Sequence, residues 1–242
     1  MKSIDINCDM GEGTGNDAAL MPYISSCSIA CGGHFGNAQT IAVTLEDAQS
    51  AGVKVGAHPS YPDQLNFGRK SLPISLPHLQ DALRQQLDLF FSLCSHPNHI
   101  KLHGALYNDL FHDLEKARAV VAVFNEYAKG IKLFCSPGSQ LAIAAAAEGF
   151  QVVYEGFGDR SYTGQGNLVA RSQAGAVLTH KEAIAHQVLR IVTKKQVNTI
   201  DHQTIPLEVQ TICLHGDGKN VLENLPYLKN HLINNGISVK AI

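Results

Sequence analysis

The stretch Ile100-Lys101-Leu102-His103-Gly104-Ala105-Leu106-Tyr107-Asn108 predicts a short buried strand that ends in reactive side chains. Ile100 and Leu102 alternate with Lys101 and His103, as in a β-strand, and the alternation stops at Gly104. A lysine, a histidine and a tyrosine after one strand can bind a carboxylate or phosphate and move protons. The alternative for Lys101 is a buried structural ion pair.

The same order, an apolar run followed by a polar residue and often a glycine, recurs along the chain. It predicts seven strands, at residues 3–8, 26–31, 53–57, 99–103, 131–135, 151–155 and 209–215. Helical spacing of apolar residues predicts six helices, at residues 38–51, 76–94, 114–128, 139–148, 181–193 and 221–234. The regular alternation favours parallel strands covered by helices.

Two architectures satisfy this alternation, an open doubly wound sheet and a (β/α) barrel. Polar residues mark the carboxyl ends of most strands: Asp9, His34, His58, His103, Glu155 and His215. A barrel gathers such ends around one mouth, whereas an open sheet spreads them along a crevice. We therefore expect one α/β domain, residues 1–242, folded as a seven-stranded (β/α) barrel whose closure is imperfect.

Composition narrows the classes of function. Of the 242 residues 45% are hydrophobic and 17% are charged, which is typical of a globular protein. The formal net charge of −2 gives no reason to expect nucleic acid or an anionic membrane as a partner. Residues 1–5 lack the features of a signal peptide, and no apolar run reaches the roughly 18 residues of a membrane span. With six cysteines, mostly in apolar runs, we expect a cytoplasmic protein with reduced thiols.

The first strand ends in Asn7-Cys8-Asp9-Met10-Gly11-Glu12-Gly13. Asp9 and Glu12 are close enough in sequence to serve as a metal ligand and a general base. Aspartate and glycine also cluster in ordinary turns, and this stretch alone does not separate the two interpretations.

Histidines follow the next two strands. His34 lies in the glycine-rich stretch Cys31-Gly32-Gly33-His34-Phe35-Gly36-Asn37, and His58 precedes Pro59. Together with Asp9 they form a candidate two-histidine, one-carboxylate site for a divalent metal, Mg²⁺ or Zn²⁺. A single histidine at such a place is more often a hydrogen-bonded core or rim residue, but three polar strand ends in succession favour a site.

Long connections bring further charges to the expected mouth. The connection at residues 59–76 carries Arg69. The connection at residues 156–175 begins directly after Glu155 and carries Asp159, Arg160 and Arg171. Arginine suits a two-pronged grip on a carboxylate or phosphoryl group, although paired charges can also hold a loop shut. The third long connection, residues 196–207, gives no comparable signal. The last strand ends in His215-Gly216-Asp217.

These motifs, taken in order, resemble the LamB/YcsF family. The matching blocks are Asn7-Cys8-Asp9-Met10-Gly11-Glu12, Ile29-Ala30-Cys31-Gly32-Gly33-His34, Gly56-Ala57-His58-Pro59, Phe67-Gly68-Arg69, His103-Gly104-Ala105-Leu106-Tyr107-Asn108, Glu155-Gly156-Phe157-Gly158-Asp159-Arg160 with Tyr162, and His215-Gly216-Asp217. Any one block is modest, but seven in order are hard to obtain by chance.

The resemblance implies a seven-stranded (β/α) barrel of the glycoside hydrolase/deacetylase type. It also implies the A component of a 5-oxoprolinase, which opens the 5-oxoproline lactam to glutamate with ATP and acts with B and C subunits. For such chemistry Lys101, Arg69 and Arg160 are candidate phosphate binders, and Asp9, Glu12 or His103 is the candidate base. The remaining candidates for binding substrate or nucleotide are Tyr107, Glu155, Asp159, His215 and Asp217.

The second block departs from the family pattern, which usually reads Asn-Ile-Ala-Cys-Gly-Phe-His-Ala-Gly-Asp. Here Ser28, Gly33, Phe35 and Asn37 stand at the Asn, Phe, Ala and Asp positions. Asn37 removes a carboxylate expected near His34, so we expect a divergent member of the family. Two other functions remain open: a metal-dependent deacetylase or amidohydrolase that needs no ATP, with Asp9, His34 and His58 as ligands, and a subunit that binds substrate without catalysis.

Overall fold

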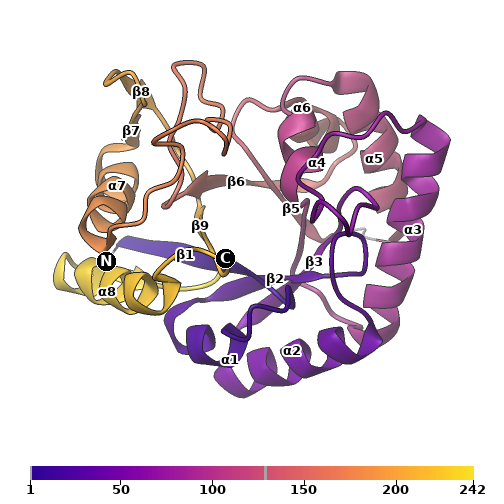
Figure 1. Ribbon diagram of the computed structural model, residues 1–242, viewed down its shortest axis with the longest axis horizontal. Coiled ribbons are helices and arrows are strands. Elements are labelled where there is room, and N and C mark those ends of the chain that lie inside the picture. The colour runs from indigo at the N-terminus through magenta and orange to yellow at the C-terminus, as the bar shows by residue number, and fades with distance from the viewer. Residues whose placement is uncertain (1, 128–129) are drawn as a thin grey trace.

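Figure 1 shows the protein as a computed structural model, which describes residues 2–127 and 130–242. Seven parallel strands form a barrel in the order β1 (Lys2–Met10), β2 (Ser26–Ala30), β3 (Lys54–His58), β4 (His99–Lys101), β5 (Lys132–Cys135), β6 (Gln151–Phe157) and β9 (Thr211–His215). The last of these pairs with both β6 and β1. The expected seven-stranded barrel is confirmed, and the ring of strands is closed where we had expected an imperfect closure.

Six helices surround the barrel: α2 (Ala38–Ala51), α3 (Leu76–Leu93), α5 (Leu114–Tyr127), α6 (Gln140–Ala147), α7 (Lys181–Lys194) and α8 (Val221–Asn234). Their described ends lie within one residue of those predicted, because apolar spacing and caps agree; the predicted end of the third helix, residue 128, lies outside the described residues. On α3, for example, Leu79, Leu83, Leu87 and Phe90 are buried. Asn37 caps α2 at its start, and Gly52 ends it in the left-handed conformation.

Short elements are missing from the sequence-based expectation. They are α1 (Asp17–Leu20), the 3₁₀ turn η1 (Met21–Tyr23), α4 (Gly104–Asp109), β7 (Gln196–Asn198), β8 (Thr204–Pro206) and β10 (Ile237–Val239). The prediction of a plain loop at residues 196–207 was wrong, since β7 and β8 form an antiparallel hairpin there. The predicted strand at 99–103 ends at Lys101, because α4 begins at Gly104 and leaves His103 at its N-cap position. Elements this short carry too few residues for a periodic pattern.

The interior of the barrel contains buried polar residues between the amino ends of the strands and the site. The Asp5 carboxylate accepts hydrogen bonds from the hydroxyls of Ser25, Ser26 and Thr211. Asn7 donates to Thr211 and to Glu155, which carries the network toward the carboxyl ends of the strands. Because these buried groups are hydrogen-bonded, they fix the strand ends that hold the site.

All six cysteines are buried free thiols. No helix among residues 2–127 and 130–242 combines the length and the apolar character needed to cross a membrane.

Candidate active site

A cavity of about 450 Å³ opens at the carboxyl ends of the barrel strands. The sequence-predicted residues that line it are Asp9, His58, Arg69, Lys101, His103, Tyr107, Arg160, Arg171 and His215. Glu12, His34, Glu155 and Asp159 lie behind this wall, in contact with residues that line it. The barrel thus brings together side chains from most of the predicted motifs.

Lys101 forms the floor of the cavity. Its buried ammonium group lies 2.7 Å from Asp9 Oδ1, 3.0 Å from Glu155 Oε1, 3.0 Å from Asn7 Oδ1 and 3.0 Å from Cys213 Sγ. Burial opposes the charge on Lys101, but Asp9, Cys213 and Glu155 outweigh it and hold its pKa well above the usual value. Burial likewise opposes the charge on Asp9, yet His58 and Lys101 hold the pKa of Asp9 well below its usual range. The two groups therefore form a buried, charged pair at neutral pH.

Glu12, His34, His58 and His103 form a buried cluster whose candidate ligand atoms lie within 4.8 Å of one another. His58 Nδ1 is 2.8 Å from the backbone oxygen of Lys101, and His103 Nε2 is 2.9 Å from that of Phe67. Because a carbonyl oxygen only accepts hydrogen bonds, both of these nitrogens carry a hydrogen. The opposite nitrogens, His58 Nε2 and His103 Nδ1, face each other at 3.1 Å.

Two facing lone pairs need a cation between them. The Glu12 Oε1 oxygen adds to this need, since it lies 3.2 Å from His103 Nδ1 and 3.9 Å from His58 Nε2. A proton on one imidazole or a divalent metal ion would satisfy the arrangement. Burial lowers the pKa of His34 to about 3 and also lowers the pKa of His103, so both side chains favour the neutral form that binds metal.

The cluster fits a divalent transition metal. Three imidazoles and one carboxylate suit Zn²⁺ better than Mg²⁺, which prefers oxygen ligands. Backbone carbonyls orient His58 and His103 in the way that supporting groups orient metal-bound histidines. Of the ligands predicted from the sequence, His34 and His58 are in this cluster, whereas Asp9 Oδ2 lies 3.4 Å from His58 Nε2 and its Oδ1 is paired with Lys101. Glu12 and His103 complete the set.

A second group of candidate ligand atoms lies next to the first. Asp9, Cys213 and His215 offer one ligand atom each within 4.8 Å. The Lys101 ammonium group, however, is already bound to Asp9 and Cys213. A positive charge at that place disfavours a second cation there.

His215 and Asp159 form a histidine–carboxylate pair at the cavity wall. His215 Nδ1 lies 3.0 Å from both carboxylate oxygens of Asp159, and the backbone N–H of His215 donates to Asp159 Oδ2. Burial opposes the charge of Asp159, but His215 holds its pKa below the usual range. The carboxylate thus keeps the hydrogen on Nδ1, which leaves Nε2 as a proton acceptor.

The arginines at the mouth differ in their surroundings. Arg69 pairs with Asp217 and lies over the Phe67 ring, 5.0 Å from its centre, with its side chain one-third exposed. Arg160 is buried and donates to the backbone oxygens of Val169 and Ala176, so it also holds its loop together. Burial, followed by the charge of Arg171, lowers the pKa of Arg160 to about 10.

The Tyr107 hydroxyl group accepts a hydrogen bond from Ser136 Oγ, 3.0 Å away.

Three residues of the site were missed by sequence reasoning. Asn7 and Cys213 contact the Lys101 ammonium, and Phe67 covers the histidine cluster, with its ring centre 5.2 Å from that of His34. Asn7 and Cys213 are interior strand positions of β1 and β9, which a sequence pattern assigns to the core. Phe67 belongs to the block Phe67-Gly68-Arg69 that carries the family resemblance, and this block could have marked it as a site residue. Its backbone is in the left-handed region, with a φ of 55°.

The closed seven-stranded barrel has the (β/α)-barrel fold of the glycoside hydrolase/deacetylase type, and histidines and carboxylates lie at its mouth. A family 4 carbohydrate esterase from Streptomyces lividans, solved in complex with acetate, shares this fold with a TM-score of 0.52 over 100% of this chain and 93% of its own, at 13% identity.

The chain belongs to the LamB/YcsF family, whose model matches residues 4–242. It is 36% identical over 251 residues to the A component of 5-oxoprolinase from Tolumonas auensis and 37% identical over 245 residues to that from Haemophilus influenzae, with 100% of each chain covered. The crystal structure of a lactam utilization protein from Thermus thermophilus has a TM-score of 0.92 and 31% identity, again over 100% of both chains.

The positions that depart from the family pattern have local roles. Asn37 Oδ1 accepts hydrogen bonds from the backbone N–H groups of Gln39 and Thr40, so its side chain caps α2. An aspartate there would cap equally well. Gly33 packs so tightly that an added Cβ would lie 2.1 Å from Gln86 Oε1. Phe35 occupies the space beside Gly13, where a Cβ would lie 2.4 Å from its ring.

Proposed function

We propose that this chain opens the lactam ring of 5-oxoproline at the expense of ATP, as the A component of a 5-oxoprolinase that also contains B and C subunits. The names of the curated relatives support this assignment. ATP as a co-substrate agrees with the cytoplasmic location expected from the sequence. In this reaction the γ-phosphoryl group of ATP is transferred to the lactam oxygen and ADP leaves. Water adds to the ring carbon, the C–N bond breaks, and the ring nitrogen takes up a proton, which gives the γ-acyl phosphate of glutamate. A second water hydrolyses this acyl phosphate to glutamate and phosphate.

The observation that carries the proposal is the buried ammonium group of Lys101 on the floor of a cavity rich in cations. A lactam is a poor electrophile, and charge develops on its oxygen when water adds. A fixed ammonium in a site of low dielectric stabilises such charge without reorganisation. Asp9 and Glu155 hold the ammonium in place from two sides.

The remaining cations at the mouth suit the anionic groups of the substrates. Arg69 and Arg171 line the cavity, and Arg69 is partly exposed, so its guanidinium group can bind the carboxylate of 5-oxoproline or a phosphate. Asp217 orients that guanidinium. Arg160 also lines the cavity and adds positive charge there while it holds its loop together.

His215 is the proposed base for the attacking water. It lines the cavity, and Asp159 holds it in the form that accepts a proton at Nε2. Asp9 is the alternative, but its pKa, held well below the usual range, makes it a weaker base. Glu12 and the lone pair of His103 Nδ1 point toward the other members of the cluster, His34 and His58, which suits them to hold a metal ion. A divalent ion held by Glu12, His34, His58 and His103 would supply Lewis-acid polarisation of an oxygen atom.

The test is release of ADP and glutamate from 5-oxoproline and ATP, measured with the chain alone and with its B and C partners. We expect product in the full mixture, and its loss with His103→Ala. Product absent from both mixtures would refute the 5-oxoproline assignment. Unchanged turnover with both Asp9→Asn and His215→Ala in the full mixture would instead indicate a subunit that delivers substrate without catalysing its conversion.

The histidine cluster favours a second candidate function, a metal-dependent deacetylase or amidohydrolase that needs no ATP. The same cluster of Glu12, His34, His58 and His103 would then polarise an amide oxygen directly. This candidate predicts stoichiometric metal in the purified chain and hydrolysis of N-acetyl substrates with no nucleotide added. Activity that requires ATP would exclude it.

A further inference from the structure

Two arginines at the catalytic cavity differ from its other cations, because no carboxylate neutralises them. The Lys101 ammonium group and the Arg69 guanidinium group are both paired with carboxylates. Arg160 and Arg171 line the same cavity. Within residues 2–127 and 130–242, neither of them forms an ion pair with a carboxylate.

Arg160 carries its unpaired charge in a buried position, where the residue is only 4% exposed. Its Nε donates to Ala176 O over 3.3 Å, and its Nη2 donates to Val169 O over 2.6 Å. The third nitrogen, Nη1, makes no hydrogen bond to a described residue, yet it is not sealed from solvent, so it is open to the cavity that Arg160 lines. A buried charge without a counter-ion is costly, and an anion in the cavity would compensate it.

Arg171 places a second positive charge near the first. Its side chain is exposed at the mouth of the cavity. Burial, and then the charge of Arg171, lowers the pKa of Arg160 to about 10, so the two guanidinium groups are within electrostatic reach of each other. Like charges at such a place repel, and an anion bound to both turns the repulsion into attraction.

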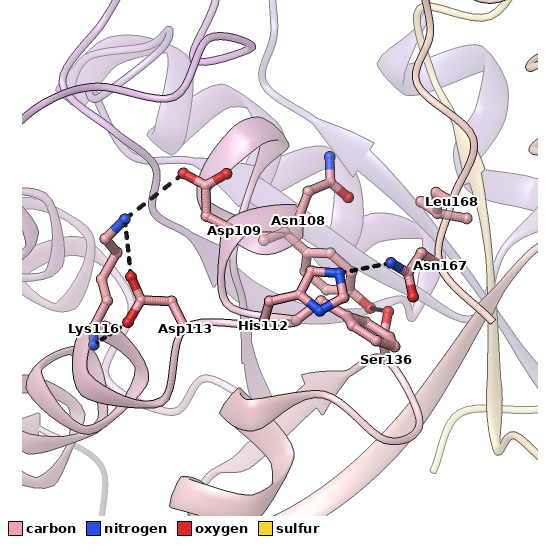
Figure 2. A pocket seen from close by; sticks show the side chains of 10 residues that line it. Asn108, Asp109, His112, Asp113, Lys116, Ser136, Asn167 and Leu168 are labelled. Atoms are coloured by element: carbon pink, nitrogen blue, oxygen red, sulfur yellow. Dashed lines mark hydrogen bonds and ion pairs between the residues drawn. The ribbon is translucent and has the colours of Figure 1, made fainter. Parts of the chain in front are cut away.

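Hydrogen bonds hold the loop that carries Arg171. The backbone N–H of Gln173 donates to Ala170 O over 2.9 Å, which closes a turn around Arg171. Earlier in the same loop, Asn167 points toward His112 on the turn between α4 and α5, as Figure 2 shows, and its Nδ2 donates to His112 Nε2 over 2.7 Å. Because the loop is already ordered, a ligand of Arg171 pays little entropy to fix its backbone.

We propose that Arg160 and Arg171 form the subsite for the phosphoryl group that passes from ATP to the lactam oxygen and is released as inorganic phosphate. This proposal rests on the ATP dependence proposed above. A phosphoryl group carries close to two negative charges at neutral pH and has three acceptor oxygens, which match two guanidinium groups that no carboxylate neutralises. A carboxylate carries one charge, and Arg69, which already shares its charge with Asp217, suits that weaker anion better.

The first test measures binding of inorganic phosphate to the purified chain by isothermal titration calorimetry at low ionic strength. We expect one phosphate per chain, and a Kd raised by at least about tenfold in Arg171→Gln, because one charged hydrogen-bonding partner is lost. Arg171→Lys keeps the charge and should recover part of the affinity. Arg118→Gln, at an exposed position on α5 outside the cavity lining, is the matched control and should bind phosphate as the natural chain does. Equal Kd values for Arg171→Gln and the natural chain, or no saturable binding, would overturn the proposal.

Competition distinguishes a phosphoryl group from the carboxylate of the substrate. An excess of 5-oxoproline should leave phosphate binding nearly unchanged, and the affinity for 5-oxoproline should be insensitive to Arg171→Gln. If 5-oxoproline instead displaces phosphate and binds more weakly to Arg171→Gln, the two arginines hold the substrate carboxylate and the proposal is wrong.

Steady-state kinetics of the chain assembled with its B and C partners separate this subsite from the proposed function. We expect Arg171→Gln to lower kcat/KM for ATP by about tenfold and to raise the inhibition constant of phosphate by a similar factor, with little change in KM for 5-oxoproline. Turnover in which neither constant responds overturns the subsite and leaves the function. Phosphate binding that depends on Arg171, in a chain that does not turn over 5-oxoproline, keeps the phosphate subsite and refutes the 5-oxoproline assignment. Neither binding nor turnover overturns both.

Discussion

At the scale of single residues, the Lys101 ammonium group makes the central charged contacts of the site. It contacts Asn7 and Asp9 on β1, Glu155 on β6 and Cys213 on β9, all of them buried. A buried ion pair contributes little net stability, because desolvation offsets the attraction, but removing one partner leaves an uncompensated charge. Lys101 is therefore both a candidate catalytic group and a sensitive structural position.

Replacing Lys101 tests this dual role. Lys101→Met leaves Asp9 and Glu155 buried without their cation, so we expect the free energy of unfolding to fall by about 3–5 kcal/mol. Urea denaturation at neutral pH measures it. Lys54→Met, at an exposed position at the start of β3, should change stability by less than about 0.5 kcal/mol. Equal effects of the two variants would show that the Lys101 pairs are energetically unimportant.

The Asp159–His215 pair makes a prediction about acid stability. Because the folded-state pKa of Asp159 is lowered, its stabilising effect is complete above the ordinary aspartate pKa of about 3.9 and is lost as the pH falls through the lower folded-state value. We expect Asp159→Asn to be less stable than the natural chain at pH ~6, with the difference shrinking toward pH ~2. Urea denaturation across this range measures it; a difference independent of pH would contradict the ionised pair.

At the scale of elements, the turn from β4 into α4 organises the cover of the histidine cluster. Gly104 has a φ of +60°, and the backbone N–H of Ala105 donates to Gly68 O over 2.9 Å. Phe67, next in the chain to Gly68, accepts from His103 through its carbonyl oxygen and stacks edge-on against that ring. The loop and the helix start therefore hold each other in place around His103.

Gly104→Ala should break this arrangement. An added Cβ would lie 2.5 Å from Gly68 O, a backbone atom that cannot easily move, and the left-handed conformation adds strain. We expect a loss of about 2–4 kcal/mol in unfolding free energy and a loss of turnover. Gly52→Ala is the control, since its φ is +69° with nothing within 4 Å of the new Cβ, and it should cost only about 1 kcal/mol. Similar losses in both variants would argue against the contact.

At the scale of the whole molecule, closure of the barrel assembles the proposed metal site from distant parts of the sequence. Glu12 follows β1, His34 follows β2, His58 ends β3 and His103 follows β4. A ligand that binds only when these strands are in place stabilises the folded chain as a whole.

Metal binding should therefore raise thermal stability. We expect one Zn²⁺ per chain and, at a hundredfold excess over Kd, about 2.7 kcal/mol of stabilisation, or a rise in Tm of about 5–10 °C. Scanning calorimetry with Zn²⁺ and with EDTA, together with metal analysis, tests both values. His34→Ala should abolish most of the shift. Two ions per natural chain would show that Lys101 does not exclude metal from Asp9, Cys213 and His215.

The sequence by itself determined the order and type of the long elements and the residues that end each strand. Helix α3 and strand β1 were predicted correctly because their apolar spacing is set by local geometry that every residue repeats. The same spacing placed Asp9, His58, Lys101 and His215 at strand ends, which in a barrel lie at one mouth.

Tertiary structure alone decided which of these residues meet and in what role. The short helix α4 is stabilised by packing, and strand β7 is stabilised by pairing with β8. No local sequence pattern predicts either element. Glu12 joins three histidines while Asp9 turns to Lys101, because the direction of each side chain depends on strands that pair across the barrel. Distances of a few ångströms between β1, β4 and β9 follow from closure of the sheet, and a linear sequence does not encode them locally.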